Sequence, residues 1–170
     1  MNNFIIVKVN SDYCNYLRQF DNKVPYNVGG KDLRPFIGVL LEIDDMKYFA
    51  PLSSPKPKHL SMKNKPDLIK IDDGKLGVVN INNMIPVYDN LIKVIDLNKE
   101  CIVKEEKQYN TLLKKQLKWL NLNKSNIYDK ALKLYDKYVS GKLNNYNSFR
   151  CCDFKLLEEK CKEYNKTIKE

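Results

Sequence analysis

The residues best suited to chemistry in this sequence lie together, just after an apolar run at 47–52. The segment Ser53-Ser54-Pro55-Lys56-Pro57-Lys58-His59 holds two hydroxyls, two lysines and the only histidine of the chain. Hydroxyl, ammonium and imidazole groups at the end of one strand can hold and cleave a phosphodiester without a metal. Serines and prolines at a strand end also form ordinary turns, so this segment alone does not establish a catalytic site.

A basic loop continues from the two hydroxyls for ten residues that include no acidic side chain. Its charged members are Lys56, Lys58, Lys63 and Lys65, and His59 lies among them. Such a loop would form a positive wall beside Ser53 and Ser54, where RNA phosphates can bind. His59 titrates near neutral pH, which suits proton transfer, although a lone histidine on a loop is often only solvated.

Arg34 belongs to a second basic segment, 29–34, which also contains Lys31. The apolar runs at 36–43 and 46–52 flank Asp44-Asp45, and this arrangement predicts a tight antiparallel hairpin. In such a hairpin the start of the first strand lies beside the end of the second. We therefore expect Arg34 to approach Ser53 and Ser54, so that two distant segments form one phosphate-sized site.

The chemistry that these groups suit is attack by a ribose 2′-OH on its own phosphate, giving a 2′,3′-cyclic phosphate and a 5′-OH. Lys56 and Arg34 provide positive charge for the phosphorane, and Lys56 can also donate a proton. Ser54 and Ser53 suit positioning and proton relay. The sequence offers no obvious general base, although His59 is a candidate for a direct role because its pKa is ordinarily near neutral pH.

The chain as a whole is basic and has the length of one domain. Its 170 residues are 43% hydrophobic, which is enough for a core, and we expect a single domain over 1–170. The formal charge of +9 comes almost wholly from lysine, since Arg18, Arg34 and Arg150 are the only arginines. This balance favours a polyanion partner, although a lysine-rich genome would also produce it.

The cysteines and apolar runs bear on metal, redox and membrane functions. Five cysteines without C-x-x-C spacing, including the adjacent Cys151-Cys152, indicate reduced thiols in a cytoplasmic protein. No zinc-type ligand spacing accompanies them, so we expect neither a metal site nor a cofactor. The N-terminal run 4–7 is too short for a signal sequence, and no run approaches the length of a membrane span.

Hydrophobic periodicity divides the chain into two halves. Short, β-branched runs separated by turn residues predict strands at 4–9, 36–43, 46–52, 68–71, 76–80 and 91–95. Ser11 can cap a helix between the first two strands, and helical stripes follow residue 97. The later helices are centred on 109–120, on 128–139 after a cap at Ser125, and on 157–168 after Asp153. The pattern predicts an α+β fold.

The segments described above resemble the ToxN/AbiQ endoribonuclease toxins of type III toxin–antitoxin systems. The most specific element, Tyr-x-Ala-Pro-Leu-[Ser/Thr]-Ser-Pro-Lys, is met here by residues 48–56. The resemblance covers nearly the whole chain in order, and its further segments are 16–25, 34–40, 77–80, 84–86 and 154–160.

That resemblance implies a compact antiparallel β-barrel core like that of the Kid/MazF toxins, elaborated by an N-terminal helix and C-terminal helices. It implies metal-independent cleavage of cellular or phage RNA, often at adenine-rich sites, in plasmid maintenance or abortive infection. The partner that it implies is a small repeated RNA, which folds as a pseudoknot and assembles with the toxin into a closed ring.

The resemblance also assigns residues. Ser54 matches the serine regarded as essential in the family, Ser53 the neighbouring hydroxyl position, and Lys56 the active-site lysine. Arg34 stands where relatives may carry lysine, so the charge is kept while its donor geometry changes. Tyr26 is the only candidate for a tyrosine that family members place in the loop before that position.

Two other readings remain open at this point. A non-catalytic module that binds structured RNA could use the same basic loop, with Ser53 and Ser54 capping backbone groups. A metal-dependent nuclease is disfavoured because carboxylates do not gather near the loop in sequence. Recognition of the antitoxin RNA should involve more surface than the active site, and we expect lysines of the C-terminal helices to contribute, with Lys124, Lys130, Lys133 and Lys137 as the candidates.

Overall fold

The strand that leads to the two serines, β4 (Met46–Ser53), is the centre of the fold. The computed structural model describes residues 2–26 and 34–168. Within them, β4 pairs along its length with four short antiparallel strands, which are β2 (Phe36–Gly38), β3 (Glu42–Ile43), β6 (Val78–Val79) and β7 (Ile85–Val87). Because partners lie on both sides of it, β4 is buried from Tyr48 to Leu52.

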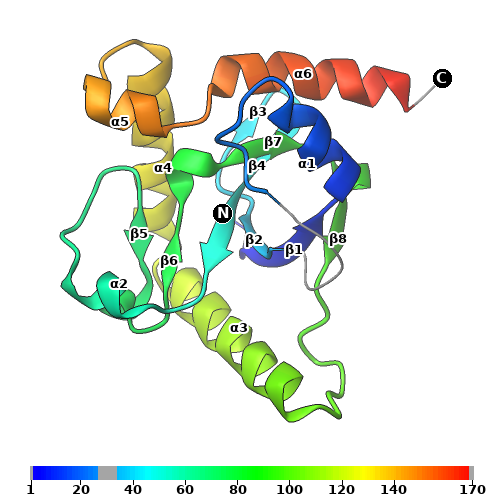
Figure 1. Cartoon of the computed structure of the whole chain (residues 1–170), viewed down its shortest axis with the longest axis vertical. Helices are drawn as coiled ribbons and strands as arrows, with labels where there is room; N and C mark the ends of the chain where they lie inside the picture. Colours follow the sequence, from blue (N-terminus) through cyan, green and yellow to red (C-terminus); the bar gives the residue numbers. More distant parts are fainter. Residues whose placement is uncertain (1, 27–33, 169–170) are drawn as a thin grey trace.

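The strands form an open sheet rather than a closed barrel (Figure 1). Three further strands complete it, namely β1 (Ile5–Val9), β5 (Ile69–Lys70) and β8 (Ile92–Val94), in the order β5-β6-β4-β2-β1-β8. In the described part of the chain the end strands β5 and β8 do not pair with each other. The α+β class is therefore confirmed, whereas the Kid/MazF-like barrel is not, because two- and three-residue strands leave the sheet unclosed.

The hairpin around Asp44-Asp45 is confirmed. Glu42 pairs with Lys47 and Ile43 with Met46, so Asp44 and Asp45 form a two-residue turn, in which Asp44 has a φ of 51°. The first strand of this hairpin is interrupted at 39–41 and so appears as β2 and β3. At Gly38 a side chain would overlap the ring of Phe49, which fills the space beside the strand.

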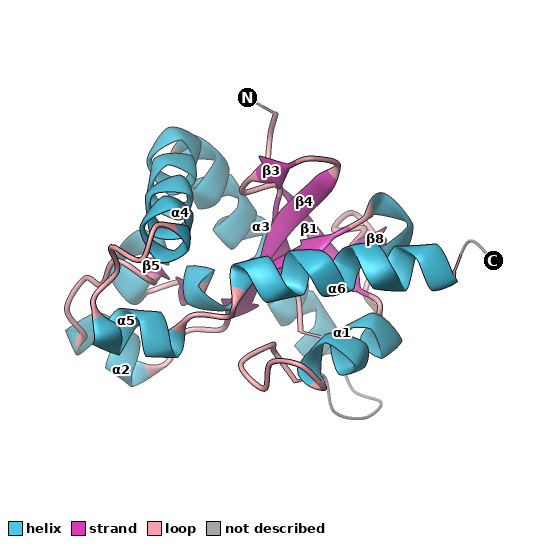
Figure 2. Ribbon diagram, turned by 90° about the horizontal axis from the view of Figure 1, so that it is seen from above, coloured by secondary structure: helices cyan, strands magenta, loops and turns pink. Residues whose placement is uncertain are grey.

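Four long helices stand where the periodicity predicts them: α1 (Ser11–Arg18), α3 (Lys104–Leu122), α4 (Lys124–Val139) and α6 (Phe154–Thr167). The cap of α1 is Asn10 rather than Ser11, since the Asn10 side chain accepts from the N–H of Tyr13. Two short helices, α2 (Pro57–Ser61) and α5 (Asn145–Arg150), were not expected from the sequence. Figures 1 and 2 show α2 and α5 on one side of the molecule and α1 on the other, while α6 contacts both α4 and α1.

Tyrosines bind the helices to the sheet. Glu158 of α6 is 6% exposed and accepts hydrogen bonds from Tyr48 of β4 (2.8 Å) and Tyr135 of α4 (2.5 Å). Paired in this way, the buried carboxylate links three elements of the core. The tyrosine hydroxyls have raised pKa values because burial disfavours their charged form. Within residues 2–26 and 34–168, no helix combines the length and apolar character needed to cross a bilayer.

Candidate functional site

The two serines lie at the point where β4 leaves the sheet. Ser53 is the last residue of β4, pairs with Val78 of β6 and is half-buried, while Ser54 is exposed. Pro55 and Pro57 then end the strand, since proline cannot donate to a β-ladder. Pro57 occupies the first turn of α2, where its missing N–H is not needed. The transition from strand to helix therefore leaves Ser54 and Lys56 exposed, with Pro55 between them in the chain.

Arg34 stands opposite the end of β4, as the hairpin predicts. Phe36 pairs with Pro51, and the N–H of Leu52 donates to the Pro35 carbonyl at 2.8 Å. Extending this antiparallel register by one further pair sets Arg34 against Ser53. Arg34, Ser54 and Lys56 are all exposed.

His59 lies inside the protein rather than on the basic surface. Only 3% of it is exposed, and its Nδ1 accepts the backbone N–H of Lys56 at 3.2 Å. In return, the backbone N–H of His59 donates to the Lys56 carbonyl at 2.9 Å. Burial lowers the pKa of His59, and the ammonium groups of Lys58, Lys56 and Lys70 lower it further. The neutral imidazole thus holds the backbone of Lys56 in place.

Asn80 is a site residue that the sequence reasoning did not single out. Its side-chain Nδ2 donates to the Ser53 Oγ at 3.0 Å, and its backbone N–H donates to the Pro51 carbonyl at 3.1 Å. With Oγ accepting from Asn80, the Ser53 hydroxyl hydrogen is directed elsewhere as a donor. The available signal was the segment 77–80, which carries part of the family resemblance but no obvious chemistry.

Two glycines allow the turn at 71–77 to pack closely against the backbone of residues 53–59. Gly77 has a φ of 97°, and a Cβ there would meet the Ser53 carbonyl oxygen and lie 3.0 Å from the Ser54 carbonyl carbon. Gly74 has a φ of 92°, and a Cβ there would meet the His59 carbonyl. Positive φ and close backbone approach both require glycine, so this turn fixes the segment 53–59 from one side.

A cavity of about 390 Å³ adjoins Lys56. Its lining combines apolar surface from Pro57 and Leu60 with the ammonium-bearing side chains of Lys56 and Lys75, and Gly74 forms part of its floor. Leu60 is 58% exposed, so a ligand can reach this surface. Apolar walls with a few cationic groups are suited to a planar base attached to a phosphate.

The remaining RNA-binding candidates separate into three groups. Lys58 is exposed on α2, and Lys63 and Lys65 follow on the loop toward β5. Tyr26 is 56% exposed, but its described contact is with the guanidinium of Arg18, 4.6 Å from the ring centroid, on the side of α1. Lys31 lies outside the described residues.

Comparison with known proteins identifies the family of the chain. Residues 5–162 match the family model of the toxin ToxN of type III toxin–antitoxin systems. The chain is 38% identical over 160 residues to the endoribonuclease ToxN of Bacillus thuringiensis subsp. kurstaki, covering 92% of this chain and 81% of that protein.

Two solved structures are similar throughout their length. One concerns selective toxin inhibition by a non-coding RNA pseudoknot in type III systems; it is 36% identical, with a TM-score of 0.81 over 96% of this chain and 99% of the other. The second is AbiQ, a lactococcal anti-phage endoribonuclease of a type III system, which is 28% identical with a TM-score of 0.80 over 97% and 99%. The chain belongs to the ToxN family of toxins of type III toxin–antitoxin systems.

Proposed function

We propose that this chain is an endoribonuclease toxin that cleaves single-stranded RNA without a metal and is restrained by a folded RNA antitoxin. The observation that supports the proposal is the pairing of Phe36 with Pro51, which directs Arg34 toward the end of β4, near the exposed Ser54 and Lys56, in a chain of the ToxN family. Two cationic groups and two hydroxyls can bind a phosphate and stabilise the charge of its transition state.

In the proposed reaction the ribose 2′ oxygen attacks the adjacent phosphorus. The new O2′–P bond forms, the P–O5′ bond breaks, the 2′ proton leaves and the 5′ oxygen gains a proton. Arg34 and Lys56 stabilise the phosphorane charge, and the Lys56 ammonium can protonate the departing oxygen. Ser54 and Ser53 position the phosphate and relay protons, with Asn80 orienting Ser53. The products carry 2′,3′-cyclic phosphate and 5′-OH ends.

The cavity beside Lys56 favours a single-stranded substrate, because a base next to the cleaved phosphate can enter the cavity only when it is unstacked. Pro57 and Leu60 provide apolar contact for a base, and adenine-rich RNA is the proposed substrate. The proposed partner is a repeated RNA pseudoknot that assembles with the toxin into a closed ring. One similar solved structure concerns inhibition of a toxin by a non-coding RNA pseudoknot. Another is AbiQ, an anti-phage endoribonuclease. For this chain we propose the same restraint and a role in phage defence or plasmid maintenance.

The test is cleavage of a labelled, adenine-rich single-stranded RNA by the purified protein in excess chelator, beside Ser54→Ala. Cyclic phosphate ends from the wild type alone would support a metal-independent ribonuclease centred on Ser54. If neither protein cleaves while both bind RNA tightly, the chain is a non-catalytic RNA-binding module. Cleavage that stops on chelation and returns with a divalent cation would contradict metal independence.

A further inference from the structure

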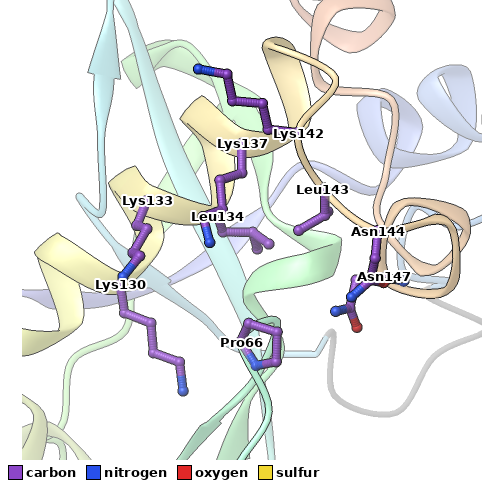
Figure 3. A pocket seen from close by; sticks show the side chains of 9 residues that line it. All are labelled: Pro66, Lys130, Lys133, Leu134, Lys137, Lys142, Leu143, Asn144 and Asn147. Atoms are coloured by element: carbon purple, nitrogen blue, oxygen red, sulfur yellow. Dashed lines mark hydrogen bonds between the residues drawn. The ribbon is translucent and has the colours of Figure 1, made fainter.

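A second basic site lies at the other side of the loop that follows α2. Four lysines are among the residues that line a cavity of about 400 Å³ between α4, α5 and Pro66, and Figure 3 shows the Lys142 side chain pointing away from Pro66 and Asn147. The four lysines are Lys130, Lys133, Lys137 and Lys142, and we call the cavity the four-lysine pocket. Its volume lies within the range of about 300–1,000 Å³ that is usual for ligand sites. Lys124 is not part of it, since its ammonium donates to the Asn3 side chain.

The charge of this pocket is not neutralised by neighbouring carboxylates. Among the described ion pairs, none joins a carboxylate to any of the four lysines. Lys130 donates to the Leu68 carbonyl at 2.7 Å, and burial lowers its pKa, with Asp67 opposing that shift. The Asp67 carboxylate is itself fully buried and paired with Arg150 at 2.8 Å. The pocket therefore keeps an excess of positive charge.

The three lysines of α4 that line this pocket lie on one face of the helix. At roughly 100° per residue, Lys130, Lys133 and Lys137 lie within about 60° of one another on the helix surface. The acidic residues of α4 lie nearest to Lys133, with Asp129 about 40° and Asp136 about 60° from it on the helix surface. Lys130 and Lys137 have no acidic residue three or four positions away on α4. Their positive charge is therefore not offset within the helix, which suits an anionic ligand.

The pocket is continuous in sequence with the proposed catalytic loop. Lys63 and Lys65 follow α2, and Pro66 then lines the pocket, so basic residues run from Lys56 to α4. One small anion would occupy only one of these places. A folded RNA presents backbone phosphates at several fixed positions, and protein recognition of such RNA depends largely on shape and phosphate contacts.

We infer that the four-lysine pocket is a separate binding site for the backbone phosphates of a folded RNA, occupied while the same RNA covers the catalytic loop. This inference rests on the proposed function for the identity of the loop. A short single-stranded substrate needs only the site at Ser54, so the pocket distinguishes the restraining RNA from the substrate. Loss of the pocket should therefore uncouple restraint from cleavage.

The test uses Lys133→Ala, Lys137→Ala and Lys142→Ala together, because all three residues are exposed and none makes a described ion pair. The matched control removes three exposed lysines of α3, with Lys107→Ala, Lys114→Ala and Lys118→Ala. Binding is measured in the Ser54→Ala background with a labelled pseudoknot RNA and with a single-stranded oligonucleotide of equal length. Phosphate contacts carry no sequence information, so a generic pseudoknot reports on them.

We expect the pocket variant to bind the pseudoknot about tenfold or more weakly, with a salt slope smaller by about 2–3 than that of the parent. Its affinity for the single-stranded RNA should change by less than about twofold, and with Ser54 intact its cleavage should be unchanged. Equal losses in the α3 control, or an unchanged pseudoknot affinity and salt slope, would overturn the inference.

Two further arms separate the remaining explanations. Saturable stabilisation by inorganic phosphate that disappears in the pocket variant, with unchanged pseudoknot binding, would assign the pocket to a small anion and overturn the inference. Thermal unfolding of both triple variants checks that they fold. Because binding is read in the Ser54→Ala background, failure of the wild type to cleave would contradict the proposed function alone, while the affinities would still decide the role of the pocket.

Discussion

The Nδ1 atom of His59 accepts the backbone N–H of Lys56 at 3.2 Å, so a buried side chain fixes the backbone that carries an exposed ammonium. An Nδ1 that accepts cannot also be protonated, and the proton of the neutral ring is on Nε2. Protonation of Nδ1 would replace this hydrogen bond by repulsion between two donors. His59 thereby links the geometry of Lys56 to pH without being placed to touch RNA.

The first prediction concerns this hydrogen bond. His59→Ala should lower the cleavage rate about fivefold, since a lost hydrogen bond is typically worth about 1 kcal/mol. His59→Asn should retain most of the activity, because its Oδ1 can accept from the same N–H. Single-turnover cleavage of single-stranded RNA measures both, with the exposed neighbour Lys58→Ala for comparison. Equal activity of the Ala and Asn variants would show that the hydrogen bond does not position Lys56.

The second prediction is a pH dependence of stability. The folded protein lowers the pKa of His59 from its ordinary 6.5, chiefly by burial and then through nearby lysines. As pH falls below about 6.5, His59 therefore becomes protonated in the unfolded chain while it stays neutral in the folded chain. The contribution of His59 to stability is present above that pH and is lost on acidification. Denaturant unfolding between pH 8 and 5 should show a steeper loss for the wild type than for His59→Asn; parallel curves would contradict this.

The sequence predicts those parts of the site that a local register determines. Phe36 pairs with Pro51 through a hairpin whose turn is two residues long, so pairing rules suffice to place Arg34 toward the end of β4. Asn80 reaches Ser53 through the β4–β6 pairing, which joins strands 27 residues apart and has no turn signal of its own. His59 could not be placed inside because nothing in a polar, proline-rich loop predicts a short helix packed on a glycine turn.

The remaining differences have similar causes. The barrel was expected from the resemblance, yet the observed strands of two and three residues end before the sheet can close. The sequence named Lys130, Lys133 and Lys137 on a predicted helix as candidates for RNA contact, but it did not predict the cavity that they line. Lys142 joins them only through the chain reversal after Gly141, whose φ is 69°. Such a reversal is possible for glycine, but its direction depends on how α5 packs.

The third prediction tests Asn80. Asn80→Ala removes the 3.0 Å hydrogen bond to the Ser53 Oγ and leaves that hydroxyl free to rotate. Cleavage should fall about threefold to tenfold, corresponding to about 0.5–1.5 kcal/mol for one hydrogen bond. The control is Asn83→Ala, because the Asn83 side chain donates to the Lys23 carbonyl, away from the serines. If both variants lose activity equally, Asn80 acts through the stability of the turn rather than through Ser53.

The fourth prediction compares two glycines with positive φ. Gly77→Ala introduces a Cβ into the backbone of Ser53 and Ser54, so the site must shift or the protein must unfold. At Gly141 the same substitution meets nothing within 4 Å, and only the strain of a left-handed residue remains, about 1–2 kcal/mol. Gly77→Ala should therefore abolish cleavage, whereas Gly141→Ala should lower the melting temperature modestly and keep full activity. Wild-type activity in Gly77→Ala would contradict the close approach of the turn.

The last prediction concerns the ion pair between Asp67 and Arg150, which anchors α5 beside the four-lysine pocket. The Asp67 carboxylate is fully buried and depends on the Arg150 Nε at 2.8 Å for its compensation. Arg150→Ala should lower the free energy of unfolding by about 3–5 kcal/mol, because it leaves a buried charge without its partner. Adding Asp67→Asn removes that charge and should restore part of the loss, whereas two independent sites would give additive losses. The exposed pair of Lys162 and Asp44 provides the comparison, since Lys162→Ala should change stability by less than about 1 kcal/mol.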